Sequence, residues 1–306
     1  MAVDLQGEPS ERRDIRSGRG RSMGIRATMI GAVAALLLVG GCASMMANAP
    51  ADVVVSEQVV RLPTSSAREL ELKVWGVEEP TAIVVFSAGG GGQPVNYDRM
   101  IRALAEEGFV VVAPVHSDAL ARGDLSGSGG PDSFAARIED LAIARGYANA
   151  AHADLPLVVM GHSFGSLMSS LTIGAATPAG PQTDPAVKAL VAFSSPGMVQ
   201  GLLTPATYRS LTAPVLMVTG DADVVQGFVT DWRSHRAMYD DSSLPGSALV
   251  VVRGADHNLI VEAADPQFEA LVDLTATFIR AHALEDATAR ARLSRINLSG
   301  AVVEQR

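Results

Sequence analysis

Short apolar runs recur along the chain from residue 53 onward, and longer stretches with helical periodicity separate them. Six runs are continuous and rich in valine, as strands buried on both faces are, and the two before them alternate apolar and polar residues. The expected strands cover 53–60, 70–75, 82–86, 109–113, 155–160, 189–193, 215–219 and 248–252, and the expected helices 97–107, 133–150, 164–176, 225–239 and 265–284. This alternation predicts an α/β fold with an eight-stranded, mostly parallel sheet and helices on both faces.

The first 41 residues predict a signal peptide. An uncharged apolar run over 27–41 follows six arginines, and as a helix it would rise only about 22 Å, short of the roughly 30 Å hydrocarbon core. The run ends at Cys42, within Leu-Val-Gly-Gly-Cys-Ala-Ser, which resembles a bacterial lipobox. The resemblance implies that Cys42 is diacylated and becomes the mature N-terminus. The alternatives are an ordinary secretory signal with an incidental cysteine and a retained anchor, and Met23 is an alternative start.

This leader places the protein outside the cytoplasm, in the cell envelope. Ala43, directly after the cysteine, resembles lipoproteins sorted to the outer membrane, facing the periplasm, in an organism that has one. After a tether over 42–52, one α/β domain is expected over 53–285, followed by a tail over 286–306 that forms a surface helix or a frayed end.

Composition excludes several classes of protein. A net charge of −9, from 24 basic and 33 acidic residues, argues against a nucleic-acid surface. A single cysteine cannot form an internal disulfide or a multi-cysteine zinc site. The chain carries no H-E-x-x-H motif, Walker loop or Rossmann fingerprint, so we expect neither a metal nor a cofactor.

Gly161-His162-Ser163-Phe164-Gly165 matches the pattern G-x-S-x-G, and so do residues 20–24 in the leader. Only the match at 161–165 has an expected strand before it and an expected helix after it, which is the context of a nucleophile elbow. Ser163 is therefore the candidate nucleophile. The N–H of Phe164, at the start of the helix, is a candidate oxyanion donor because free N–H groups and the positive dipole end lie there.

A serine nucleophile needs a base, and the base needs an orienting acid. His257 follows the last valine-rich strand, whereas the other histidines lie in the elbow, in helical stretches or before the nucleophile. Two aspartates follow the preceding strand, and the G-x-x-D spacing favours Asp223 over Asp221. Asp221 and Asp256 are expected to cap turns.

These motifs together resemble the α/β-hydrolase superfamily over nearly all of 53–285. Phe86-Ser87-x-Gly-x-Gly, Tyr97, Gly108 to Pro114, His116 with Asp118, and Arg137 to Leu141 resemble the dienelactone hydrolase and platelet-activating factor acetylhydrolase branch. The match implies Gly90, then Gly89, as the second oxyanion donor. One departure is that Ala88-Gly89 stands where the branch has His-Gly. Asp118, Arg137 and Asp140 are expected to form structural ion pairs.

The resemblance implies a serine hydrolase that cleaves carboxylic esters through an acyl-enzyme on Ser163. Residues 194–211 are too few for a large cap, so an open site for small or short-acyl esters is expected, lined by Met198, Leu202 and Tyr208. Other readings remain open: an acyltransferase or a peptidase with the same triad, or a non-catalytic envelope lipoprotein that uses the fold to bind a ligand. The expected partners are a small-molecule ester and, through Cys42, a membrane.

Overall fold

The computed structural model describes residues 53–119, 131–180, 182–199, 202–204 and 206–306. The predicted signal peptide, the tether, Cys42 and the second G-x-S-x-G match at 20–24 lie outside the described residues. No helix in the described part of the chain is both long and apolar enough to span a bilayer.

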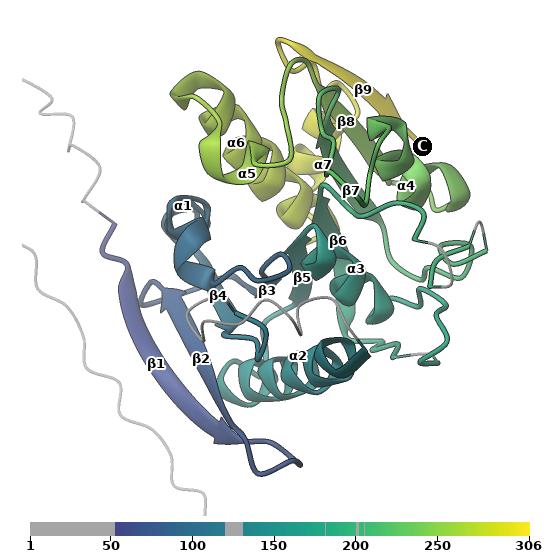
Figure 1. Cartoon of the computed structure of the whole chain (residues 1–306). Helices are drawn as coiled ribbons and strands as arrows, with labels where there is room; N and C mark the ends of the chain where they lie inside the picture. The colour runs from purple at the N-terminus through teal and green to yellow at the C-terminus, as the bar shows by residue number, and fades with distance from the viewer. Residues whose placement is uncertain (1–52, 120–130, 181, 200–201, 205) are drawn as a thin grey trace, which may run out of the picture. The chain divides into compact units, whose positions relative to one another are not determined.

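A nine-stranded sheet runs through the described chain (Figure 1). In spatial order its strands are β1 (Ser56–Pro63), β2 (Glu69–Gly76), β4 (Phe109–Pro114), β3 (Ala82–Ser87), β5 (Leu157–His162), β6 (Val187–Phe193), β7 (Val215–Gly220), β8 (Ala248–Val252) and β9 (Ala301–Gln305). The strands from β4 to β8 are parallel, and β1, β2 and β9 pair antiparallel with their neighbours. The predicted mostly parallel α/β sheet is confirmed.

Helices cover both faces of the sheet. The helical segments are η1 (Pro94–Tyr97), α1 (Asp98–Glu106), α2 (Pro131–Ala151), α3 (Phe164–Leu171), η3 (Trp232–Arg236), α4 (Ala237–Asp241), α5 (Leu259–Glu262), α6 (Asp265–His282) and α7 (Ala287–Leu293). Residues of α1, α5, α6 and α7 share one core with Val84 and Phe86, while those of α2, α3 and α4 share the other with Ile83 and Val85. Successive strand residues point to opposite faces, so an unbroken apolar strand serves both cores.

Two expectations about the elements were wrong. In the tail over 286–306, α7 agrees with the expected helix, but β9 was not expected: it pairs with β8 from Ala301 to Gln305, so the sheet has nine strands rather than eight. The helix expected over 225–239 begins only at Trp232. Before it, Val225 bridges Val229 around Gly227, whose φ of +82° favours glycine and ends helical geometry.

Candidate active site

The G-x-S-x-G segment forms a sharp turn from β5 into α3. Ser163 has φ of +52° and ψ of −123°, a strained conformation for a residue with a side chain. A Cβ on Gly161 would lie 2.4 Å from the Gly165 carbonyl, and one on Gly165 would lie 2.0 Å from the carbonyl oxygen of Ser87. The two glycines therefore allow α3 to start directly against the ends of β5 and β3, which leaves Ser163 half-buried at the carboxyl edge of the sheet.

Asp223 and His257 lie together at the same edge, after β7 and β8. His257 Nδ1 donates to Asp223 Oδ1 over 2.8 Å, and Asp223 Oδ2 accepts from Thr219 Oγ1 over 2.8 Å. Burial raises the pKa of Asp223, but hydrogen bonds from His235 and His257 outweigh it and hold the pKa well below its usual range. The carboxylate is therefore ionised, and it fixes the imidazole with Nε2 as the nitrogen that can accept a proton.

A chain of hydrogen bonds joins the elbow to the loop of His257 and to residues 88–92 after β3, which we call the glycine loop. Tyr97 Oη accepts from Gly89 N–H over 3.0 Å and, since its own proton must go elsewhere, donates to His162 Nδ1 over 2.9 Å. His162 Nε2 then donates to the His257 carbonyl oxygen over 2.8 Å. Burial and the nearby His257 lower the pKa of His162 to about 4, which is consistent with this neutral tautomer. His162 thus ties the loop of His257 to the turn that carries Ser163.

The two candidate oxyanion donors in the glycine loop, Gly89 and Gly90, differ in whether the N–H group already has an acceptor. Gly89 is buried, and its N–H already donates to Tyr97, so it is not available to a substrate. Gly90 is exposed, and no described residue accepts a hydrogen bond from its N–H. Phe164 is the first residue of α3, where an N–H has no intrahelical acceptor. The donors that remain are Gly90 and Phe164.

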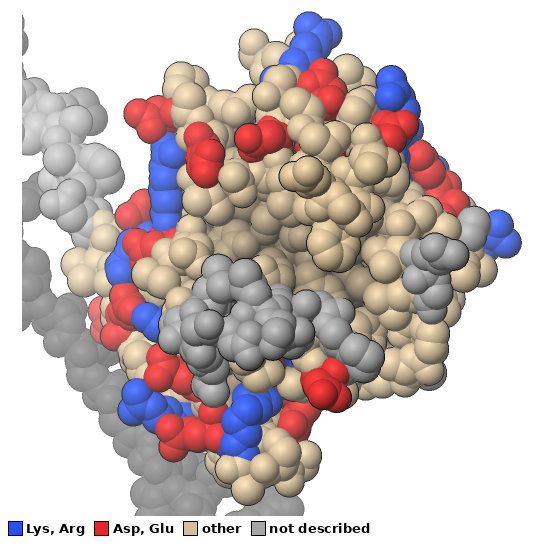
Figure 2. Space-filling model, in the orientation of Figure 1, with Lys and Arg blue, Asp and Glu red and all other residues tan. Residues whose placement is uncertain are grey.

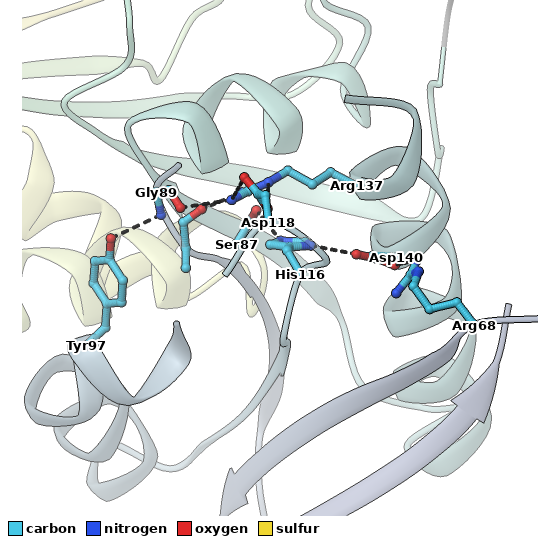
Figure 3. A network of polar contacts seen from close by, with 9 residues as sticks. Arg68, Ser87, Gly89, Tyr97, His116, Asp118, Arg137 and Asp140 are labelled. Carbon is cyan, nitrogen blue, oxygen red and sulfur yellow. Dashed lines mark hydrogen bonds and ion pairs between the residues drawn. The ribbon is translucent and has the colours of Figure 1, made fainter. Parts of the chain in front are cut away.

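Arg137, from α2, reaches this loop from the side and binds its carbonyl oxygens (Figure 3). Its Nη1 donates to the Ala88 carbonyl over 2.6 Å, its Nη2 to the Gly89 carbonyl over 2.9 Å, and Asp118 pairs with its Nε over 3.0 Å. In a trans peptide the C=O and N–H point in opposite directions. The clamp on the Gly89 carbonyl therefore turns the Gly90 N–H away from Arg137. The guanidinium also lies 4.7 Å from the centre of the Phe164 ring, so one buried cation touches both donor segments.

A second Ser-His-Asp chain lies beneath the loop and is also drawn in Figure 3. Ser87 Oγ lies 2.9 Å from His116 Nε2, and His116 Nδ1 lies 2.9 Å from Asp140 Oδ2. All three side chains are fully buried, so no substrate can reach Ser87. Burial and Arg137 lower the pKa of His116 to about 4, as expected for a neutral ring that accepts from the serine and donates to the aspartate. This chain is structural, and Asp140 also pairs with Arg68.

The predicted pocket residues have different surroundings. Met198 is 42% exposed, and Leu202 packs partly against the core that contains α2 and α3. Tyr208 is fully buried in that core, where burial raises its pKa to about 12, so its assignment to the substrate pocket was wrong. Asp221 accepts from Gly254 N–H over 2.6 Å and Asp256 from Asn258 N–H over 2.9 Å, the turn roles expected of them.

Among the described residues, one group of side chains has the spacing to hold a metal ion. It consists of Asp223, His235 and His257, whose ligand atoms lie within 4.8 Å of one another. Asp223 Oδ1, however, already accepts from His257 Nδ1 at 2.8 Å and lies 3.0 Å from His235 Nε2. The ligand atoms are therefore bonded to each other. These three side chains form a hydrogen-bonded cluster in which protons lie between the ligand atoms, and not an open metal site.

Sequence reasoning missed four residues of this site: Tyr97, Arg137 and His162 as tethers of the loops, and His235 beside Asp223. The strand order is that of the α/β-hydrolase fold. In this order the glycine loop follows β3, the serine turn follows β5, and Asp223 and His257 follow β7 and β8. The model of a family described as serine aminopeptidase, S33 (Hydrolase_4), matches residues 78–206, which include β3, the glycine loop and the elbow. The match supports an α/β hydrolase and ends before Asp223 and His257. No curated protein matches the chain.

Proposed function

We propose that the protein is a serine hydrolase that cleaves carboxylic esters through an acyl-enzyme on Ser163. The observation that carries the proposal is the Asp223 to His257 hydrogen bond of 2.8 Å in a loop that His162 ties to the elbow. A buried, ionised acid, an oriented imidazole and a serine on a strained turn are the parts that acyl transfer requires. The chemistry needs no cofactor.

In this mechanism His257 Nε2 takes the proton of Ser163 as Oγ attacks the carbonyl carbon of the ester. The resulting imidazolium faces the Asp223 carboxylate, which stabilises it. The oxyanion accepts hydrogen bonds from Gly90 and Phe164 N–H, which the protein holds in place before the reaction. Collapse expels the alcohol, which takes the proton from His257, and water attacks the acyl-enzyme in the same way. In the resting structure Ser163 Oγ makes no hydrogen bond to a described residue, and such bonds often tighten only when substrate binds.

Small or short-acyl esters are the proposed substrates. The described residues between β6 and β7 form turns and no helix, so they supply no large cap. Exposed apolar side chains follow the carboxyl ends of these two strands: Met198 at 42%, Val224 at 54% and Phe228 at 81% exposure. The face seen in Figure 2 is hollowed near its centre, and the described residues that border the hollow are mostly uncharged. An uncharged acyl group suits such a rim better than an ionic one does.

A peptidase is the second candidate, because the matching family model describes serine aminopeptidases. The same triad can attack an amide, and the two activities differ in the substrates that they accept. We would compare p-nitrophenyl acetate, butyrate and octanoate with alanine and proline p-nitroanilides on one preparation. The proposal expects kcat/KM to be highest on the short esters. Faster turnover of the anilides would make the protein a peptidase, and turnover of long esters alone would contradict the open site.

The remaining alternatives are tested on the same preparation. An acyltransferase would yield new esters when alcohols are added, whereas the proposed hydrolase yields mainly free acid. A binding module would turn over none of these substrates. The resemblance to the dienelactone hydrolase and platelet-activating factor acetylhydrolase branch, whose His-Gly is here Ala88-Gly89, favours hydrolysis of small esters.

We also propose that the enzyme works in the cell envelope, anchored by a lipid on Cys42. The proposal is supported by the lipobox-like residues 38–44 at the end of an apolar run. The Cys42→Ser variant should move from the membrane to the soluble fraction, while Ser163→Ala, as a matched control, should stay on the membrane. Unchanged fractionation of Cys42→Ser would contradict lipidation.

A further inference from the structure

His235 is a fully buried histidine that contacts the proposed catalytic acid, Asp223. It lies in η3, which follows the loop after β7. Its Nε2 lies 3.0 Å from Asp223 Oδ1 and 3.1 Å from the Asp223 carbonyl oxygen. Its Nδ1 is hydrogen-bonded to the Ser195 carbonyl oxygen. Asp223 Oδ1 is thus shared between two histidines.

The partners of His235 determine its protonation. A carbonyl oxygen can only accept, and an ionised carboxylate can only accept. Both ring nitrogens of His235 face such oxygens, so both must carry hydrogen for every contact to be a hydrogen bond. A neutral ring would turn a bare nitrogen toward an oxygen in the interior, which is costly. Burial opposes the charged form, but the hydrogen bond and the charge of Asp223 outweigh it, so the pKa of His235 is raised.

Resting on the proposed function, we propose that His235 is a buried imidazolium that neutralises Asp223 and so keeps His257 available as a base at lower pH. The rings of His235 and His257 lie 6.0 Å apart with 28° between their planes, and Asp223 Oδ1 lies 3.0 Å from His235 Nε2 and 2.8 Å from His257 Nδ1. The charge of His235 partly cancels that of Asp223, so the carboxylate stabilises the protonated form of His257 less than it would alone. His235 is a positioning residue, because it reaches the reacting atoms only through Asp223.

The other charged groups around His235 do not replace this contact. His162, in the elbow, is neutral by its own hydrogen bonds. On the same segment as His235, Arg233 pairs with Asp231, and Arg236 pairs with Asp240 and Glu304. These arginines have their own acidic partners. Asp223 is the carboxylate within ion-pair distance of His235 among the described residues.

The first test reads the charge directly and needs no activity. Imidazole ¹⁵N spectra of the wild-type protein should show His235 with both nitrogens protonated from pH 5 to pH 8. A single protonated nitrogen at pH 7 would overturn the proposal. Because this measurement does not depend on turnover, it stands even if the protein proves not to cleave esters.

The second test is the pH profile of His235→Gln, in which the amide can still donate to Asp223 but carries no charge. We would follow the rate of fluorophosphonate labelling, which needs an active serine and base but no known substrate. A unit charge about 6 Å away, at an effective dielectric constant of about 20, predicts that the acidic limb moves up by about two pH units. The matched control is His282→Gln, a histidine at the end of α6, whose acidic limb should stay in place. A limb that does not move in His235→Gln, or moves down, would refute the charge role even if the rate falls.

Discussion

Arg137 holds the glycine loop that carries the proposed oxyanion donor Gly90, and Arg137→Met tests this dependence. Methionine fills similar space but removes the donors to the Ala88 and Gly89 carbonyls and the ion pair with Asp118. Breaking a buried ion pair by removing one partner costs about 3–5 kcal/mol of folding stability. Loss of one well-placed oxyanion donor costs about 10²- to 10³-fold in kcat, or roughly 3–4 kcal/mol in the transition state.

The expected result for Arg137→Met is a lower Tm together with a kcat about 100-fold below wild type and a KM within about threefold. KM should change little because the oxyanion exists in the transition state and not in the bound ester. The assay is hydrolysis of p-nitrophenyl acetate below the Tm of the variant, with rates expressed per active site titrated by a fluorophosphonate.

Arg145→Met is the matched control. Arg145 also lies on α2 and forms a partly buried ion pair, with Asp184 over 2.9 Å, but it has no contact with the glycine loop among the described residues. It should lower the Tm and leave kcat per active site unchanged. Equal kcat values for Arg137→Met and the wild type would refute the claim that Arg137 orients Gly90.

Three further predictions follow from the described contacts. Tyr97→Phe leaves a buried N–H and a nitrogen of His162 without a partner, so it should lower stability by about 1–3 kcal/mol and reduce kcat, as urea unfolding and ester hydrolysis would measure. His116 and His162, whose burial lowers their pKa from 6.5 to about 4, bind protons near pH 6.5 only when unfolded, so each should cost about 2 kcal/mol between pH 7 and pH 5. His235, whose pKa is raised, has the opposite sign and offsets part of this loss in urea midpoints. Removal of 301–306 strips β9 from β8 and should lower the Tm and promote self-association in light scattering, with the labelling rate of Ser163 retained.

Each of these predictions has a result that would contradict it, and the tyrosine variant also has a matched control. For Tyr97→Phe it is Tyr208→Phe, since Tyr208 is also buried but its hydroxyl has no hydrogen bond to the glycine loop or to His162, so its loss should leave kcat unchanged. If both tyrosine variants behave alike, the hydroxyl bridge is unimportant. A urea midpoint that rises from pH 7 to pH 5 would contradict the neutral buried histidines. An unchanged Tm after removal of β9 would show that the last strand adds nothing to the sheet.

The strands and the serine turn could be predicted because their signals are local. Valine-rich runs mark buried strands, and Gly161 and Gly165 flank a serine between a strand and a helix. His257 and Asp223 follow from chain order at the sheet edge. By contrast, β9 has only five residues with a partly exposed pattern, and nothing in 301–305 says that it will pair with β8.

The tethers of the site could not be predicted because they join residues far apart in sequence. Arg137 meets the Gly89 carbonyl across 48 residues, and His162 meets the His257 carbonyl across 95. The sequence shows an arginine and a histidine, whereas their partners depend on how α2 and the loops pack. The same holds for His235, which was expected within a helix over 225–239 and instead lies in η3, because the break at Gly227 was not recognised.

The most direct test of the account is the site of fluorophosphonate labelling. The account predicts one phosphonyl group per chain, on the peptide containing Ser163, and none on Ser163→Ala. Ser87, which belongs to the buried Ser-His-Asp chain, should stay unlabelled in both proteins. Label on Ser87, equal labelling of Ser163→Ala, or no labelling of the folded wild-type protein at any pH would contradict the central claim.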